Sequence, residues 1–244
     1  MHYETTSARK HRHSLLHPML DGDIQSKFLE GLNSIERSDI IQASSYRRFS
    51  HVSVPAHERD PATHLFLLIK GSARFFFLTP SGRQVYLLWL EPGDIFGGAA
   101  LLSQPTTFLV STEVAKDAHV LVWTRDVMRT LARRYSRLLE NLLAITHDYI
   151  LWYLGTHLSL VSYTARQRLA HVLLSLAHRR GQGSLLNASL EITNEQLANT
   201  ANITQFTVSR LLSEWRRCGA ITKTRGKLVL TRPELLNTNL RVLG

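Results

Sequence analysis

Two hydroxyl side chains eleven residues apart, Thr193 and Thr204, can each accept a hydrogen bond from the free N–H groups at the start of a helix. Gln196 follows Thr193 by three residues and completes a capping box. Asn202 lies between the two starts, where a left-handed backbone is needed, and asparagine tolerates that conformation better than most residues. The sequence therefore predicts a helix over 194–201, a four-residue turn and a second helix directly after Thr204, which is a helix-turn-helix unit.

Polar side chains gather on one face of that second helix. At 100° per residue, Val208, Leu211 and Trp215 point to the core. The opposite face and its edge carry Gln205, Phe206, Ser209, Arg210, Ser213 and Arg217. Glutamine can bond adenine, arginine can bond guanine and serine is permissive, while Thr204 and the free backbone N–H groups can hold a phosphate. We predict that the N-terminal part of this helix enters the DNA major groove.

The segment GAITKTRGKLVL follows the second helix and predicts a two-stranded wing. We assign DNA contacts to its three bases, Lys223, Arg225 and Lys227, and to Thr193 at the start of the first helix. The whole chain carries 29 Lys and Arg against 19 Asp and Glu, a net charge of +10. Eleven of these bases and three acids fall within 164–232, which leaves +8 near the helix-turn-helix. Such an excess favours an anionic partner, and its location favours double-stranded DNA.

The remaining elements must position this unit. Over 46–123, short apolar or alternating runs are separated by turn residues, which is typical of an antiparallel sandwich or barrel of about eight strands. Helical periodicity follows, in a short helix after Arg125 and then in a rod over 136–163 that contains no proline. The fold class is therefore α+β, with a jelly-roll-like β-roll, a long helix and a winged helix-turn-helix. We divide the chain into a polar tail (1–20), a roll (21–125), a dimerisation helix region (126–163) and a DNA-binding domain (164–244).

The long helix is apolar on more than one side, so it has two surfaces to bury. One would pack on the roll and the other would pair with a second copy of the chain. We assign the pairing surface to a heptad-like seam of Leu138, Leu142, Ile145, Tyr149 and Trp152. A neighbouring phase through Leu139, Leu143, Ile150 and Leu154 fits nearly as well, and the register stays open.

The order of roll, long helix and winged helix-turn-helix resembles the Crp/Fnr family of bacterial transcription regulators. The stretch KGSARFFFLTPSGRQVYLLWLEPGDIFGGAALL is similar to the family's roll and phosphate cassette, and ITNEQLANTANITQFTVSRLLSEWRRCGAITKTRGKLVL is similar to its DNA-binding signature. The resemblance implies a cytoplasmic homodimer that works with RNA polymerase, in which the roll senses a signal and the long helices relay it. It places an effector pocket near Gly97, Gly98, Ala99, Leu109 and Val110.

The chain departs from the family members that bind cyclic AMP. Those members carry a glutamate where Gly98 stands and an Arg-Ser pair at about Leu109 and Val110, and 101–123 contains no arginine. A phosphate buried there would lack a charge partner, so we expect no tight binding of cyclic AMP. Many relatives also place a glutamate where Phe206 stands, which leaves the half-site sequence open. Phe206 could contact a thymine methyl group instead.

We expect neither a cofactor nor a metal. Cys218 is the only cysteine and cannot hold an iron–sulfur cluster alone. Less favoured alternatives are a haem sensor using one of the roll histidines and redox control through Cys218. A roll that senses nothing, in a regulator controlled by its abundance, also stays open. An enzyme is disfavoured because the only His-x-His pair, His11 and His13, lies outside the roll, and the apolar runs are too short to span a membrane.

Overall fold

The computed structural model describes residues 24–82, 84–180, 187–224 and 227–236. They divide into two compact units. The first runs up to Phe77 and resumes over Leu88–Thr146, and the second comprises Leu78–Leu87 and the residues from His147 onward.

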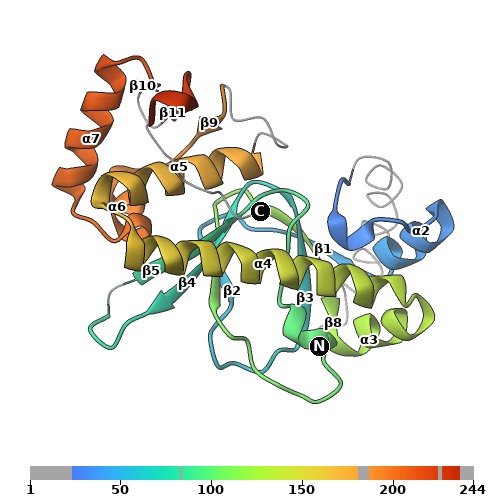
Figure 1. Cartoon of the computed structure of the whole chain (residues 1–244). Coiled ribbons are helices and arrows are strands. Elements are labelled where there is room, and N and C mark those ends of the chain that lie inside the picture. Colours follow the sequence, from blue (N-terminus) through green and yellow to red (C-terminus); the bar gives the residue numbers. More distant parts are fainter. Residues whose placement is uncertain (1–23, 83, 181–186, 225–226, 237–244) are drawn as a thin grey trace, which may run out of the picture. The chain divides into compact units, whose positions relative to one another are not determined.

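Eight strands lie between residues 45 and 124, as the sequence predicts, and they form two four-stranded antiparallel sheets (Figure 1). One sheet has the order β1-β8-β3-β6 and the other β2-β7-β4-β5. The strands are β1 (Ser45–Arg48), β2 (Ser53–Ala56), β3 (His64–Lys70), β4 (Ala73–Leu78), β5 (Gln84–Leu90), β6 (Ile95–Phe96), β7 (Ser111–Val114) and β8 (His119–Thr124). The expected antiparallel roll, and with it the α+β fold class, is confirmed.

Short helices flank this roll. They are η1 (Lys27–Leu29), α2 (Ser34–Gln42), η2 (Gly98–Leu101) and α3 (Arg125–Arg134). The buried Trp123 on β8 donates a hydrogen bond from its indole N–H to the carbonyl of Ile40 in α2 at 2.7 Å. The bond satisfies a polar group that would be costly to bury alone, and it fixes α2 on the first sheet.

The predicted long helix is α4 (Arg137–Ser162), and its first half packs in the first unit. Buried Asn141 donates to the carbonyls of Phe28 at 3.0 Å and Glu30 at 2.9 Å, which fastens α4 to the segment around η1. A Cβ atom added at Gly98 would lie 3.0 Å from the Leu142 side chain, so α4 also lies directly against η2.

The pairing seam assigned from the sequence needs correction. Leu138 is fully buried and Ile145 is 7% exposed, because this side of α4 faces its own roll; Leu142, Tyr149 and Trp152 of the same phase are half-buried. Leu138 and Ile145 are therefore not available to a second copy. The large apolar side chains that α4 leaves exposed belong to the neighbouring phase and its flanks: Leu139, Leu143, Ile150, Tyr153, Leu154, Leu158, Leu160 and Val161.

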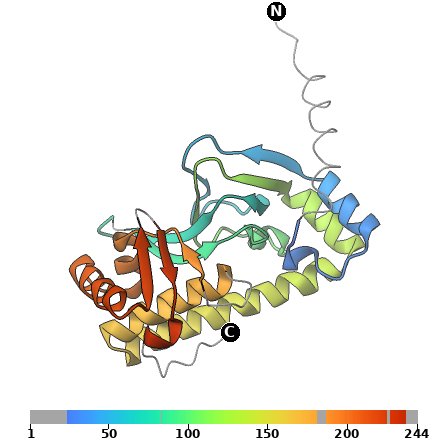
Figure 2. The same ribbon diagram turned by 90° about the horizontal axis from the view of Figure 1, so that it is seen from above.

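The second unit holds α5 (Ala165–Arg180), α6 (Asn194–Ala201) and α7 (Gln205–Arg217) around a small sheet. The sheet order is β10-β11-β9, from β9 (Ser189–Leu190), β10 (Ile221–Thr224) and β11 (Lys227–Leu230), and η3 (Pro233–Leu236) follows it. From above, the red strands β10 and β11 lie beside α7 (Figure 2), in line with the predicted wing. Trp215 and Leu212 of α7, Leu173 of α5 and Leu228 of β11 are among the buried residues that form the core of this unit.

Candidate nucleic-acid interface

The helix-turn-helix forms as its capping residues predict. The Thr193 hydroxyl accepts a hydrogen bond from the Gln196 backbone N–H at 3.1 Å, and the Gln196 side chain accepts one from the Thr193 N–H at 2.8 Å. Asn202 then takes a left-handed backbone with φ 50°. The Thr204 hydroxyl accepts from the Thr207 N–H at 3.1 Å and caps α7. Local side-chain bonds therefore fix the two helix starts and the turn between them.

The two faces of α7 differ as expected. Val208, Leu211 and Trp215 are buried, and Leu212 joins them. All six side chains assigned to the DNA face are exposed: Gln205, Phe206, Ser209, Arg210, Ser213 and Arg217. Thr204, at the edge of this face, is exposed as well. Phe206 is 79% exposed, although a phenylalanine gains most when it is buried.

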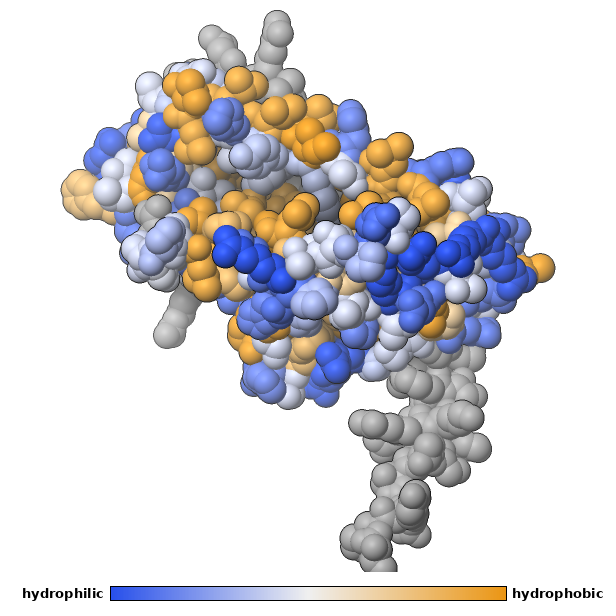
Figure 3. Space-filling model, turned by 90° about the horizontal axis from the view of Figure 1, so that it is seen from below, coloured by the Kyte–Doolittle hydropathy of each residue, from blue (hydrophilic) through white to orange (hydrophobic). Residues whose placement is uncertain are grey.

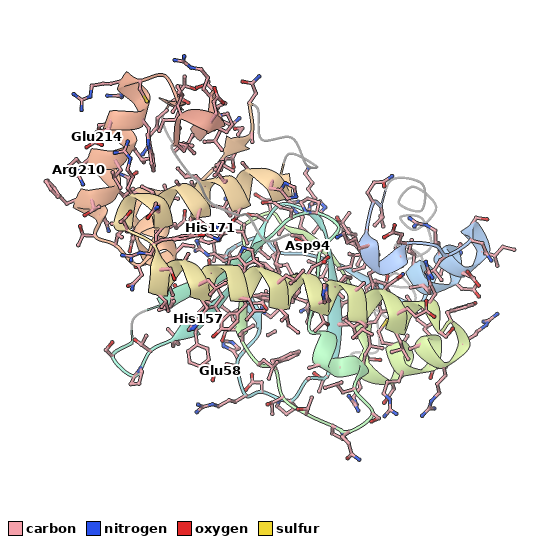
Figure 4. All side chains as sticks on the ribbon, in the orientation of Figure 1. Glu58, Asp94, His157, His171, Arg210 and Glu214 are labelled. Carbon is pink, nitrogen blue, oxygen red and sulfur yellow. The ribbon has the colours of Figure 1, made fainter. Side chains whose placement is uncertain are left out.

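Arg210 is bonded to Glu214, which is itself bonded to Arg166, and neither partner was assigned a role from the sequence. The Arg210 guanidinium donates to one carboxylate oxygen of Glu214 at 2.7 Å, one turn along α7 (Figure 4). Arg166 from α5 donates to the other oxygen, also at 2.7 Å, and its guanidinium lies 5.4 Å from the Trp215 ring centre. The bond from Arg166 is the main cause that lowers the pKa of Glu214. The spacing of Arg210 and Glu214 is a recognisable i,i+4 pair, whereas no local signal points to Arg166.

A second hydrogen-bonded chain reaches Ser209. Lys223 on β10 donates to the side-chain oxygen of Asn194 at 2.5 Å, and the Asn194 amide nitrogen donates to the Ser209 hydroxyl at 2.8 Å. Lys223 is half-buried, and this burial, followed by the charge of Arg216, lowers its pKa. Lys223 is thus bonded to α6 and not fully exposed, and its DNA contact stays a prediction. Lys227 is exposed, and Arg225 lies outside the described residues.

The five residues suggested for the effector pocket differ in how far they are exposed to solvent. Gly97, Gly98 and Ala99 are half-buried at the start of η2. Gly97 has φ 79°, and a Cβ atom there would lie 2.4 Å from the His64 carbonyl oxygen, so only glycine fits. In the loop before β7, Val110 is half-buried, but Leu109 is 80% exposed and therefore lines no closed pocket.

Three further features can be stated for the described residues. No group of three or more His, Cys, Asp or Glu side chains there is placed to hold a metal ion. The described helices also lack the combined length and hydrophobicity that a membrane span requires. Cys218 is exposed at the end of α7, where its thiol donates to the Trp215 carbonyl at 3.3 Å.

Comparisons with known proteins agree with this architecture. Residues 46–135 match the cyclic nucleotide-binding domain family, and residues 167–238 match the Crp-like helix-turn-helix domain family. The Anaerobic regulatory protein of Bacillus subtilis is 25% identical over 221 residues, which cover 82% of this chain and 89% of that protein. The Cyclic AMP receptor protein of Thermus thermophilus is 29% identical over 181 residues, covering 74% and 81%.

Solved structures show the same fold. FixK2 from Bradyrhizobium japonicum has a TM-score of 0.69 at 23% identity and covers 82% of this chain and 98% of that one. The regulator CLP of Xanthomonas campestris has a TM-score of 0.67 at 16% identity, with coverage of 82% and 99%. The chain thus combines a cyclic nucleotide-binding-like roll with a Crp-like helix-turn-helix, and its relatives along most of its length are regulators of this type. It belongs to the Crp/Fnr family of transcription regulators.

Proposed function

We propose that this transcription regulator binds DNA as a homodimer and reads a specific sequence with the exposed face of α7. The observation that carries the proposal is the contrast between the two faces of this helix. Its apolar side is buried in the core of the second unit. In contrast, Gln205, Ser209 and Arg210 are exposed near the free N–H groups at the start of the helix. Side chains of these types hydrogen-bond the edges of base pairs, and a helix start accepts a phosphate.

The charge of the second unit supports the same partner. Arg217 on α7 and Lys227 at the start of β11 are exposed, in a segment whose bases exceed its acids by eight. Exposed bases of this kind neutralise phosphates and release bound counterions, so they add affinity without sequence preference. Arg210 is different, because its guanidinium is bonded to Glu214, and Arg166 in turn bonds the other oxygen of that carboxylate. We assign it to a guanine.

The exposed phase of α4 supports a dimer. Leu139, Leu143, Ile150 and Leu154 recur along one helix face and are each at least 46% exposed. Figure 3 shows hydrophobic residues, in orange, reaching the surface between hydrophilic ones, in blue. A helix with such a stripe gains free energy by pairing with an identical stripe across a two-fold axis. Two copies of α7 would then meet two half-sites, one helical turn of DNA apart.

The roll contacts α4 directly, through η2. Because Gly98 lies against Leu142, a shift of η2 would press on the paired helix. We propose that any effector of the roll acts through this contact. We also propose that this effector is not cyclic AMP, because Gly98, Leu109 and Val110 stand where a glutamate and an Arg-Ser pair would be needed. Control by abundance alone is the competing proposal, and RNA polymerase in the cytoplasm is the partner that a regulator of this family would serve.

Selection of bound duplexes from a random pool tests the proposal, with and without cell extract to reveal any effector. Purified protein should enrich a two-fold symmetric sequence with half-site centres about 10 base pairs apart. Arg210→Ala should then lose about 1–3 kcal/mol at one G·C pair of each half-site and little elsewhere. Arg133→Ala, which removes an exposed arginine of α3, is the matched control and should leave the preference unchanged. No enrichment, or an equal loss by Arg210→Ala on all sequences, contradicts the proposed reading.

A further inference from the structure

Three side chains from separate elements form one hydrogen-bonded chain behind the exposed face of α7. Lys223 of β10 lies 2.5 Å from Asn194 of α6, and Asn194 lies 2.8 Å from the hydroxyl of Ser209 on α7. Asn194 is the first residue of α6, and Ser209 is exposed next to Arg210. The chain thus links the half-buried base of the wing to one of the polar side chains on the proposed DNA face.

The donor at one end fixes the direction of every bond in this chain. A lysine ammonium has three donors and no acceptor, so the carbonyl oxygen of Asn194 must face Lys223. An asparagine side chain has one oxygen and one nitrogen, and the amide nitrogen therefore faces Ser209. The Ser209 hydroxyl must accept that bond. Its own hydrogen is consequently available in another direction.

Two groups compete for this hydrogen. A serine inside a helix can donate back to the carbonyl four residues earlier, here that of Gln205. Among the described residues, the structure shows Asn194 as the hydrogen-bond partner of the Ser209 hydroxyl and no bond to Gln205. The other acceptor is whatever lies against the exposed face of α7.

We propose that Asn194 and Lys223 are positioning residues that make Ser209 a hydrogen-bond donor toward DNA. Ser209 then prefers a base that presents an acceptor in the major groove, such as guanine, the N7 of adenine or the O4 of thymine. It disfavours cytosine, whose amino group is a donor. The inference rests on the proposed function, since it assumes that α7 lies in the groove, and it adds a rule for one base position.

Asn194→Asp tests this rule with little change of shape. Aspartate still accepts from Lys223, and a negative charge suits the first turn of α6. It cannot donate to Ser209, so the hydroxyl donates to the carboxylate and offers lone pairs to the DNA. The preference at one base position should therefore shift toward cytosine by about three- to tenfold, the worth of one hydrogen bond.

Matched variants separate this effect from charge and from folding. Asn202→Asp adds the same charge at an exposed residue of the turn between α6 and α7, and it should weaken binding to all sequences alike. Ser209→Ala should remove the preference at that position, and adding Asn194→Asp to it should change the preference no further. A melting temperature of Asn194→Asp that is not below that of the wild type shows that the unit stays folded.

The readout is the binding constant on duplexes that vary one base pair at a time. A shift at one position with Asn194→Asp, absent with Asn202→Asp, supports the inference. Equal losses on all duplexes with both aspartate variants, or an unchanged profile with Ser209→Ala, overturn it. If Arg210→Ala still alters its own base pair in that case, only this inference fails. If the wild-type protein distinguishes no duplex at all, the proposed function fails with it.

Discussion

Leu143→Glu tests whether the exposed stripe of α4 pairs two chains. The Leu143 side chain is 71% exposed in the single chain. Full burial of a leucine is worth about 1.5–3 kcal/mol, so covering the exposed part gives about 1–2 kcal/mol. A two-fold interface counts each residue twice, and the total is about 2–4 kcal/mol before the cost of burying a glutamate. The dissociation constant of the dimer should rise at least about 30- to 700-fold.

Sedimentation equilibrium over a series of protein concentrations measures this constant directly. Leu109→Glu is the matched control, because Leu109 is 80% exposed but lies in a loop of the roll. We expect Leu109→Glu to dissociate like the wild type and Leu143→Glu to become monomeric at concentrations where the wild type is paired. Binding to a symmetric duplex should weaken in parallel. If both glutamate variants dissociate alike, the exposed stripe is not the pairing surface and the reasoning from exposure is refuted.

Further outcomes follow from single residues. His171 of α5 is 4% exposed, neither of its ring nitrogens has a hydrogen-bond partner among the described residues, and burial lowers its pKa from 6.5. Below pH 6.5 the unfolded chain therefore binds a proton that the folded chain does not. As the pH is lowered, the free energy of unfolding should decrease by at most about 1.4 kcal/mol per pH unit. Urea denaturation at pH values above and below 6.5 measures this dependence, and His171→Leu should flatten it. If the slope of unfolding free energy against pH is the same in both proteins, His171 is not its cause. Thr193→Ala should cost about 1 kcal/mol in the same assay, because the α6 cap is lost, whereas Ser213→Ala should cost little. Calorimetric titration with cyclic AMP should show no saturable binding, and a micromolar dissociation constant would overturn the argument from Gly98.

The helix-turn-helix could be predicted to the residue because its signals are local. The bounds of α6, the left-handed Asn202 and the start of α7 all depend on side chains within four residues of the backbone groups that they satisfy. Thr193 and Thr204 identify these starts without knowledge of any distant contact. The buried set of α7 follows from helical periodicity in the same way.

The register of α4 and the groups behind α7 could not be predicted, because distant contacts determine them. Both apolar phases of α4 fit a seam, and the choice depends on the side that faces the roll, where Asn141 bonds carbonyls more than 110 residues earlier in the chain. Lys223 bonds Asn194, which lies 29 residues earlier in the sequence, and Arg166 bonds Glu214, which lies 48 residues later. Only the folded chain brings these partners together, so their hydrogen bonds could not be predicted from the local sequence.

The most direct test of the central claim places a photoreactive group on α7 itself. Benzoylphenylalanine can replace Phe206, which is 79% exposed, with little cost to the core. On a selected symmetric duplex, irradiation should attach the protein to bases inside each half-site, because the proposed function places α7 in the major groove. The same group at Phe77 of β4, which is 38% exposed, should give no such adducts. DNA that is bound yet crosslinks through residue 77 and not through residue 206 would contradict the account.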